Sequence, residues 1–259
     1  MVLTVHPSLI NNDIRIFLKH ELSEIAHQRQ LDGWPRDKDL DLLCHRAGGL
    51  FVYAVATVKF LDSNTHLPKQ RLDAIVNLPE CTVPEGKTHF RPKTTLDSLY
   101  TSILQMAFSN GDPGVDYKVR SILAAVVLLV VPLPSSGITE LIGLDLEEVV
   151  LLLTLVQSLL AFDGNKPSQP VKPFHKSFPD FITDPSHCTD MRFYISPGHF
   201  HFVLATNCLK VMNDGLEQNL LSLPDYILNS EVKDLQTRIN NHISIGLQVC
   251  LQILVQTPD

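Results

Sequence analysis

Apolar residues recur every three or four positions along most of this chain, which is the period of a helix with one buried face. The first such stripe follows Asn12 and Asp13, whose side chains are typical of a helix N-cap. Its apolar members are Ile14, Phe17, Leu18, Leu22 and Ile25. The pattern predicts a helix that ends before Gly33-Trp34-Pro35, because glycine and proline interrupt helices.

A second stripe opens at Asp37 and is interrupted by Gly48-Gly49 before apolar residues resume at Leu50. Each glycine costs a helix about 1 kcal/mol. We therefore expect two helices joined by a sharp turn rather than one continuous helix. A shorter helix is predicted at 69–78.

Thr94 and Asp97 have the spacing of a capping box and predict the start of the next helix. Its inward residues are Leu96, Leu99, Tyr100, Ile103 and Ala107, and the Gly- and Pro-rich run 110–114 ends it. The pattern then predicts a buried helix ending at Pro132, a short helix at 136–142 that Gly143 stops, and a helix from Asp145 through Leu160.

A β-hairpin is predicted next, with strands at 161–162 and 171–174 around a turn at 163–165. Helical periodicity returns at 199–212. It also returns at 235–254, where few residues mark the helix ends. The fold class is therefore mainly α, with a small β-hairpin followed by further helices. Several helices followed by a hairpin and another helix are typical of a winged helix.

The run 173–182 (PFHKSFPDFI) contains the residues that most clearly suggest a ligand contact. Ser177 and Asp180 repeat the capping-box spacing, and Pro179 falls in the first turn, where its missing N–H costs nothing. His175 would then lie just outside a helix N-terminus, which favours an anion. This makes His175 a candidate phosphate sensor, with a structural histidine at a domain corner as the alternative.

Composition narrows the choice of compartment and partner. The chain is 44% hydrophobic and 19% charged, enough for a substantial core, and its net charge of −7 argues against nucleic acids and anionic membranes as partners. Five scattered cysteines fit a reducing compartment. The most apolar run, 122–131, is about half of a bilayer span. The N-terminus lacks the features of a signal peptide, so we expect a cytoplasmic protein.

Two motifs imitate active sites. Gly86-Lys87-Thr88 resembles the end of a phosphate-binding loop, but Cys81 stands where the loop needs glycine, so we interpret it as an ordinary loop. Scattered histidines and cysteines suggest zinc but lack paired ligand spacing, so no metal site is predicted. They are His175, His187, Cys188, His199, His201 and Cys208. A Cys–His nucleophile pair stays open, because its partners need only meet in space.

A winged-helix pattern raises the possibility of DNA binding, but the sequence argues against it. A recognition helix presents basic and amide side chains to phosphates and base edges. The helix before the hairpin, 146–160, has no Lys or Arg and carries Glu147 and Glu148. It is typical of a core helix with an acidic outer side.

Four segments in order carry a family resemblance, namely 34–35 (WP), 43–54 (LCHRAGGLFVYA), 95–100 (TLDSLY) and 174–182 (FHKSFPDFI). Together they resemble the region after the nucleotide-binding core in NACHT-type signalling NTPases of the STAND class. The nearest resemblance is to the large fungal group of these innate-immunity-like proteins. It covers residues 13–235.

The resemblance implies a domain order. Residues 1–12 would be a remnant of the nucleotide-binding core, 13–80 a small helical domain and 81–94 a linker. A winged helix at 95–185 and the start of a second helical domain at 186–259 would follow.

The resemblance also implies a nucleotide site. His175, supported by Ser177, would contact the β-phosphate of bound ADP in the closed state. The turn Gly48-Gly49-Leu50 would lie against adenine, although Phe51 replaces the proline usual at the next position.

A complete phosphate loop and a strand ending in paired acids for Mg²⁺ are missing from the sequence. We therefore expect a truncated regulatory segment that is not an enzyme and needs no cofactor in isolation. ADP or ATP is implied only for an intact parent chain. Partners would be proteins, or further copies reached through the missing core. The alternatives are a nucleotide-independent helical scaffold and a Cys- or metal-dependent hydrolase.

Overall fold

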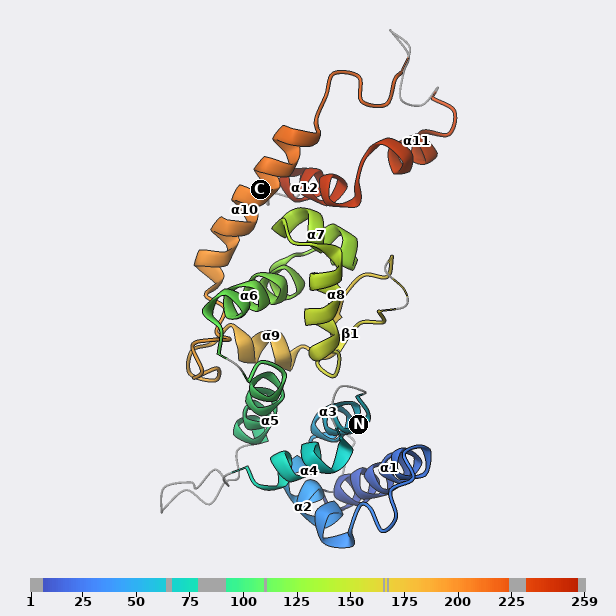
Figure 1. Ribbon diagram of the computed structural model, residues 1–259, viewed down its shortest axis with the longest axis vertical. Helices are drawn as coiled ribbons and strands as arrows, with labels where there is room; N and C mark the ends of the chain where they lie inside the picture. The colour runs from blue at the N-terminus through green and yellow to red at the C-terminus, as the bar shows by residue number, and fades with distance from the viewer. Residues whose placement is uncertain are drawn as a thin grey trace, which may run out of the picture. The chain divides into compact units, whose positions relative to one another are not determined.

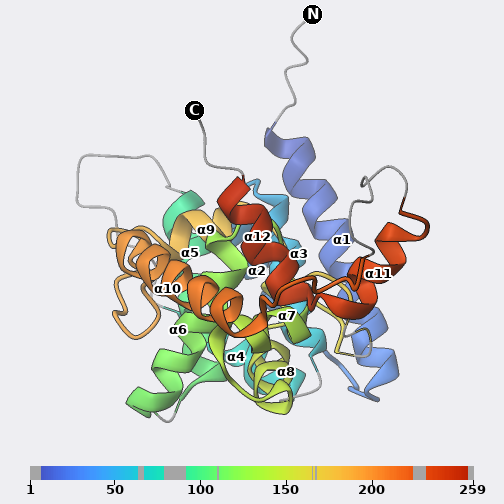
Figure 2. The same cartoon turned by 90° about the horizontal axis from the view of Figure 1, so that it is seen from above.

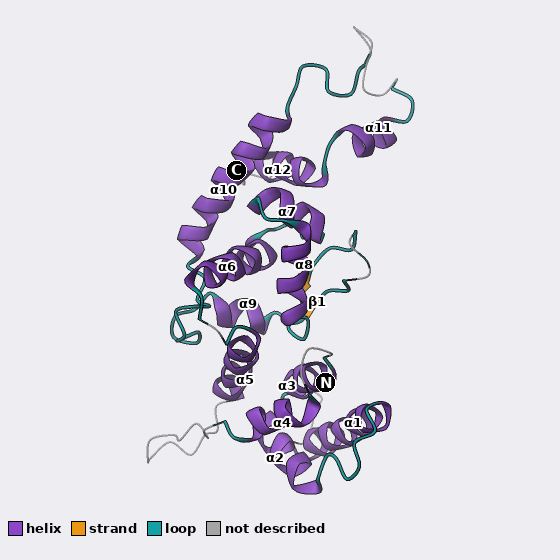
Figure 3. Ribbon diagram, viewed as in Figure 1, coloured by secondary structure: helices purple, strands orange, loops and turns teal. Residues whose placement is uncertain are grey.

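A computed structural model describes residues 7–63, 67–78, 92–109, 111–164, 166, 168–223 and 232–255. Within them the protein is mainly helical with one two-stranded sheet, which confirms the predicted fold class (Figure 3). The chain forms two compact units. The first comprises 1–111, 155–160 and 174–191, and the second 112–154, 161–173 and 192–259.

The first unit is a helical cluster. Its helices are α1 (Pro7–Gln28), α2 (Asp37–Ala47), α3 (Phe51–Asp62), α4 (Pro68–Val76), α5 (Pro92–Ala107) and α9 (Ser177–Ile182). α1 packs against α2 and α3, and α5 packs against α2, α3 and α4 (Figure 1). The apolar stripes predicted from the sequence supply the core, with Ile14, Leu18, Leu43 and Ile103 fully buried.

Two buried arginines tie the helices of this unit together. Arg46 on α2 donates to the carbonyls of Val76 at 3.1 Å and Leu78 at 2.6 Å, which satisfies acceptors at the end of α4. Arg71 on α4 donates to the Phe60 carbonyl, and its guanidinium lies 4.6 Å from the centre of the Phe60 ring. Polar anchors therefore supplement apolar packing here.

The second unit is also built from helices. They are α6 (Pro113–Leu128), α7 (Ser135–Ile142), α8 (Leu146–Leu155), α10 (Pro197–Gly215), α11 (Leu235–His242) and α12 (Ile245–Val255). α10 packs against α6, α7 and α12, and α12 also packs against α7 (Figures 1 and 2).

Glycines allow close helix packing in this unit. A Cβ at Gly215 would lie 2.9 Å from Leu247 Cδ2, and one at Gly246 would lie 2.6 Å from Glu140 Cδ. Glu140 also accepts from the Gly246 N–H at 3.1 Å, and its other oxygen accepts from the Ser244 hydroxyl. These contacts fix the start of α12 against α7 and α10.

The predicted hairpin is present but short. β1 (Leu160–Ala161) pairs with β2 (Lys172–Pro173), and the Val171 N–H donates to the Leu133 carbonyl at 2.8 Å. Asn165 in its predicted turn lies outside the described residues.

Several local predictions are confirmed. α2 starts at Asp37 and α7 ends at Gly143, which has a φ of 75°. Gly48 and Gly49 have φ values of 51° and 82° and separate α2 from α3, as the predicted sharp turn requires.

Other predicted boundaries are wrong. α1 begins at Pro7, so Asn12 and Asp13 lie inside the helix. Proline is favoured in the first turn of a helix, and no residue between Pro7 and Asn12 interrupts the helix. α5 begins at Pro92 for the same reason, so the predicted start at Thr94 and Asp97 lies inside the helix. Residues 1–6 of the predicted core remnant and the segment 79–91, with Cys81 and Gly86-Lys87-Thr88, lie outside the described residues.

Two long predicted helices are shorter than expected. α8 ends at Leu155, and turns at 156–159 lead to Leu160 in β1. The predicted helix at 235–254 is two helices, because Ser244 caps α12 by accepting from the Leu247 N–H at 3.2 Å.

The predicted domain boundaries remain predictions. α5 belongs to the first unit and α6 to the second, so the proposed winged helix at 95–185 has residues in both. Among the described residues, the structure shows no helix with the length and hydropathy needed to cross a bilayer.

Candidate functional site

The segment around His175 is anchored on α5. The Tyr100 hydroxyl lies 2.8 Å from Ser177 Oγ, and Ser177 Oγ lies 2.8 Å from His175 Nδ1. The Ser177 backbone N–H also donates to His175 Nδ1 at 3.1 Å. A chain of polar contacts thus runs from a core helix to an exposed histidine.

These contacts assign the hydrogens. A backbone N–H can only donate, so His175 Nδ1 is an acceptor, and the neutral ring carries its proton on Nε2. Ser177 Oγ then donates to Nδ1 and accepts from Tyr100. The ring is left with a single N–H donor, Nε2, on an exposed side chain.

Aromatic packing holds Tyr100 in place. Its ring centre lies 5.5 Å from that of Phe178, edge to face, and 5.4 Å from that of Phe181. Burial raises the pKa of Tyr100, and the charge of Asp97 raises it further against the opposing effect of the Ser177 hydrogen bond. Tyr100 therefore stays a neutral donor at physiological pH.

The predicted capping box at Ser177 and Asp180 is wrong. α9 has six residues, its N-cap is Lys176, and Ser177 is the first helical residue. The Ser177 hydroxyl is already engaged by His175 and Tyr100, so it does not cap the helix.

The amides that were expected to attract an anion are also occupied. The N–H of Ser177 donates to the His175 ring, that of Phe178 to the His175 carbonyl, and that of Asp180 to the Lys176 carbonyl. Pro179 has no N–H. Any anion contact at this point must therefore come from the His175 ring and not from the start of α9.

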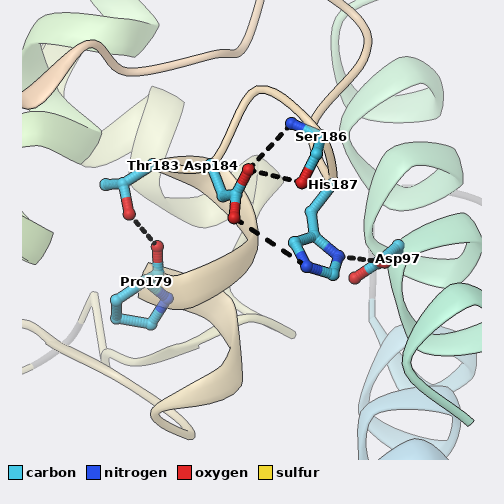
Figure 4. Close-up of polar contacts among 6 residues, drawn as sticks. All are labelled: Asp97, Pro179, Thr183, Asp184, Ser186 and His187. Carbon is cyan, nitrogen blue, oxygen red and sulfur yellow. Dashed lines mark hydrogen bonds and ion pairs between the residues drawn. The ribbon is translucent and has the colours of Figure 1, made fainter.

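A second polar cluster lies on the same face of α5, three residues before Tyr100. His187 Nδ1 lies 2.7 Å from Asp97 Oδ2, and His187 Nε2 lies 3.9 Å from Asp184 Oδ2 (Figure 4). Asp184 also accepts from the backbone and hydroxyl of Ser186, at 2.8 and 2.6 Å. The cluster fastens residues 184–187 to α5, so Asp97 acts as a tertiary anchor instead of a cap.

The turn at 48–50 is built as the sequence predicts. The Gly48 N–H donates to the carbonyls of Cys44 and His45, and the Leu50 N–H donates to the Ala47 carbonyl at 2.7 Å. Phe51, which replaces the expected proline, is 44% exposed, and its ring centre lies 4.9 Å from that of Phe17.

The turn and His175 are linked through α3. The turn precedes the first residue of α3, while Lys59 near its other end places Nζ 4.1 Å from the centre of the Phe174 ring. At 1.5 Å per residue, Phe51 and Lys59 are separated by about 12 Å along the helix. The two predicted features therefore lie toward opposite ends of one helix.

Of the histidines and cysteines considered in the sequence, His201 and Cys208 line one cavity of the second unit, whereas Cys188 lacks the character of a nucleophile. Cys188 is buried, and burial with the charges of Asp190 and Asp97 raises its pKa to about 12, opposite to the shift that activates a cysteine nucleophile. In the described part of the chain, no group of three or more His, Cys, Asp or Glu side chains could hold a metal ion.

Comparison with known proteins identifies no family, since no protein-family model, curated protein or solved structure matches the chain. The resemblance to NACHT-type NTPases therefore stays a prediction.

Sequence reasoning missed the partners that organise the site. Tyr100 was expected only as a core residue and Asp97 only as a cap. Tyr100 contacts a residue 77 positions away, and Asp97 contacts one 90 positions away. The one signal available in the sequence was Tyr100 itself, because a buried tyrosine hydroxyl needs a polar partner.

Proposed function

We propose that this chain is a non-catalytic regulatory segment of a NACHT-type nucleotide switch, in which His175 contacts the diphosphate of bound ADP. The observation that supports this most is the fixed ring of His175, which has Nε2–H as its donor. A sensor of this kind needs an oriented donor on an accessible side chain. The proposed setting is the cytoplasm, with protein partners.

The position of the glycine turn fits the same proposal. ADP has its adenine and its β-phosphate at opposite ends, and the turn and His175 lie toward opposite ends of α3. In this arrangement the turn at 48–50 would contact adenine while His175 would contact the β-phosphate. The nucleotide itself would be held by a nucleotide-binding core, because the start of α9 has no amide to offer.

The regulatory effect follows from the strength of one hydrogen bond. A bond between a neutral donor and a charged phosphate oxygen contributes roughly 1.5–3 kcal/mol. If it forms only in the closed ADP state, its loss shifts the closed–open equilibrium by about ten- to a hundredfold.

The test is His175→Ala in a protein that joins a nucleotide-binding core to this segment. We expect ADP to dissociate about ten- to a hundredfold faster, with a larger oligomeric fraction in the absence of a stimulus. Ser177→Ala should have a smaller effect, because the Ser177 N–H still holds Nδ1. His20→Ala, which removes an exposed histidine of α1, is the matched control and should change neither quantity.

An unchanged ADP release rate in His175→Ala would contradict the proposal. The nucleotide-independent helical scaffold would then be the better account of the chain.

The 259-residue chain alone should bind ADP and ATP only weakly, because one ring N–H is a small part of a nucleotide site. Isothermal calorimetry is the direct measurement. A micromolar dissociation constant, equivalent to about −8 kcal/mol, would show a nucleotide site within this chain and would contradict the division of roles proposed here.

A further inference from the structure

An apolar cavity of about 360 Å³ lies in the second unit, beside α10. One face of α10 lines it through Leu204, Cys208 and Met212, and the end of α6 with the residues that follow lines another part. Val130 and Leu209 also line the cavity and are 80% and 59% exposed. The cavity therefore opens to solvent at these two residues.

Two cysteine side chains from different helices meet in this cavity. Cys208 lies on α10 and Cys250 on α12, and they are only 6% and 1% exposed. Both are free thiols. The two helices approach closely where Gly215 of α10 meets Leu247 of α12, and the bonds from Ser244 and Gly246 to Glu140 fix the start of α12 on α7. The pairing is thus a consequence of tight helix packing.

The two sulfurs differ in reactivity. The Cys250 thiol donates a hydrogen bond to the Cys208 sulfur, which lowers the pKa of Cys208 and raises that of Cys250. Burial raises the pKa of Cys44, and it also raises that of Cys188. The lowered pKa favours Cys208 as the nucleophile of the pair, and a second thiol lies beside it.

We propose that Cys208 and Cys250 form a redox-active dithiol that a small, uncharged hydroperoxide oxidises to a disulfide through the cavity. The lining, which is apolar apart from His201, admits such an oxidant more readily than a charged disulfide such as oxidised glutathione. Disulfides of this kind in reducing compartments are typically transient and redox-sensing.

The reaction has two steps. The Cys208 thiolate attacks one peroxide oxygen and the O–O bond breaks. Cys208 becomes a sulfenic acid, and the alcohol leaves with the proton that the Cys208 thiol lost. The Cys250 thiol then attacks the Cys208 sulfur, the S–S bond forms, and the hydroxyl leaves as water with the Cys250 proton. The two thiols lose two electrons, and the peroxide gains them.

Peptide mapping of the whole 259-residue chain tests this directly. Trypsin places each of the five cysteines in a separate peptide, with Cys208 in 193–210 and Cys250 in 239–259. After treatment of the folded protein with tert-butyl hydroperoxide and blocking of free thiols, we expect these two peptides to be linked. Their combined mass should be two hydrogens less than the sum, and the link should disappear on reduction.

Variants assign the roles of the two sulfurs. Cys250→Ser should leave a sulfenic acid on Cys208 that dimedone traps, whereas Cys208→Ser should leave Cys250 unmodified. Cys188→Ser, which removes another buried thiol, should give the same linked peptide as the unaltered chain.

The proposal is overturned if folded, unaltered protein yields no link between 193–210 and 239–259. It is also overturned if oxidation stops at a sulfinic or sulfonic acid on Cys208. Mapping of the unaltered chain needs no substitution to fold, so a negative result stands on its own.

Discussion

The two units of this protein are both helical but use different means to fix their segments. In the first unit, 174–191 is held on α5 by polar side chains, through the Tyr100–Ser177–His175 chain and the Asp97–His187 pair. In the second, α12 is fixed on α10 by close packing at Gly215. The polar contacts on α5 orient single groups such as the His175 ring, whereas the close packing at Gly215 positions a whole helix. Substitutions should therefore act locally in the first unit and through helix displacement in the second.

The largest effect is expected for Gly215→Val in the second unit. Its Cβ would lie 2.9 Å from Leu247 Cδ2, so α12 must shift or Leu247 must leave its rotamer. Overpacking of this kind costs about 1–3 kcal/mol. Urea unfolding followed by far-UV circular dichroism should show the loss. Gly198→Val is the control, because nothing lies within 4 Å of a Cβ there.

Gly49→Val should cost about 2 kcal/mol in the first unit for a different reason. A Cβ at Gly49 has room, with Ile10 Cγ2 at 4.0 Å, but a φ of 82° strains a β-branched residue. The single tryptophan, Trp34, lies in this unit, so its fluorescence reports the transition. Gly49→Asn, which tolerates positive φ, should be milder. An unchanged midpoint for Gly49→Val would refute the strained turn.

Asp39→Ala should cost about 1 kcal/mol at pH 7. Asp39 is buried at the start of α2, where it accepts from the Arg36 backbone at 3.3 Å and from its guanidinium at 2.8 and 3.0 Å. Burial opposes ionisation, but the Arg36 hydrogen bonds outweigh it and hold the pKa of Asp39 below its usual value.

The size of the Asp39 effect depends on pH. A lowered folded pKa gives stability that is present above the unfolded pKa of about 3.9. That stability is lost as pH falls through the folded value. Parallel urea titrations at pH 7 and about pH 2 should therefore show the difference between Asp39→Ala and the unaltered chain shrinking in acid. A constant difference would rule out the ionic contribution.

The smallest losses of stability are expected for the hydrogen-bonded hydroxyls of Tyr100 and Ser177. Tyr100→Phe keeps the aromatic packing but removes the donor to Ser177, and should cost about 0.5–1.5 kcal/mol, as should Ser177→Ala. Because the two groups share one bond, the double variant should cost less than the sum of the singles. Strict additivity in this double-mutant cycle would show that the bond contributes nothing to stability.

Local signals predicted much of the fold. Asp37 as a helix start and Gly143 as a stop depend on residues adjacent in sequence, and the glycine pair at 48–49 depends on backbone φ alone. The break before α12 was missed although Ser244 is a local cap signal, and Glu140, more than a hundred positions away, helps to fix the break. Prolines that begin helices, Pro7 and Pro92, were also overlooked as start signals.

The candidate site was predictable only in part. His175 and Ser177 are two residues apart, so their contact is local, and the sequence singled them out. The assumption that the start of α9 binds an anion failed, because its amides find partners within the segment itself. Tyr100 and the Cys208–Cys250 pair depend on tertiary packing that no local pattern encodes.

Nitrogen-15 NMR of the His175 ring tests the central claim most directly, because the sensor role requires Nε2–H as the donor. In the 259-residue chain at a pH of about 8, an ordinary imidazole is neutral. We predict a pyridine-like signal for Nδ1 and a pyrrole-like signal for Nε2, with at most a partial shift toward tautomer-averaged values in Ser177→Ala, because the backbone N–H at position 177 still donates to Nδ1. A proton on Nδ1, or averaged signals in the unaltered chain, would contradict the account.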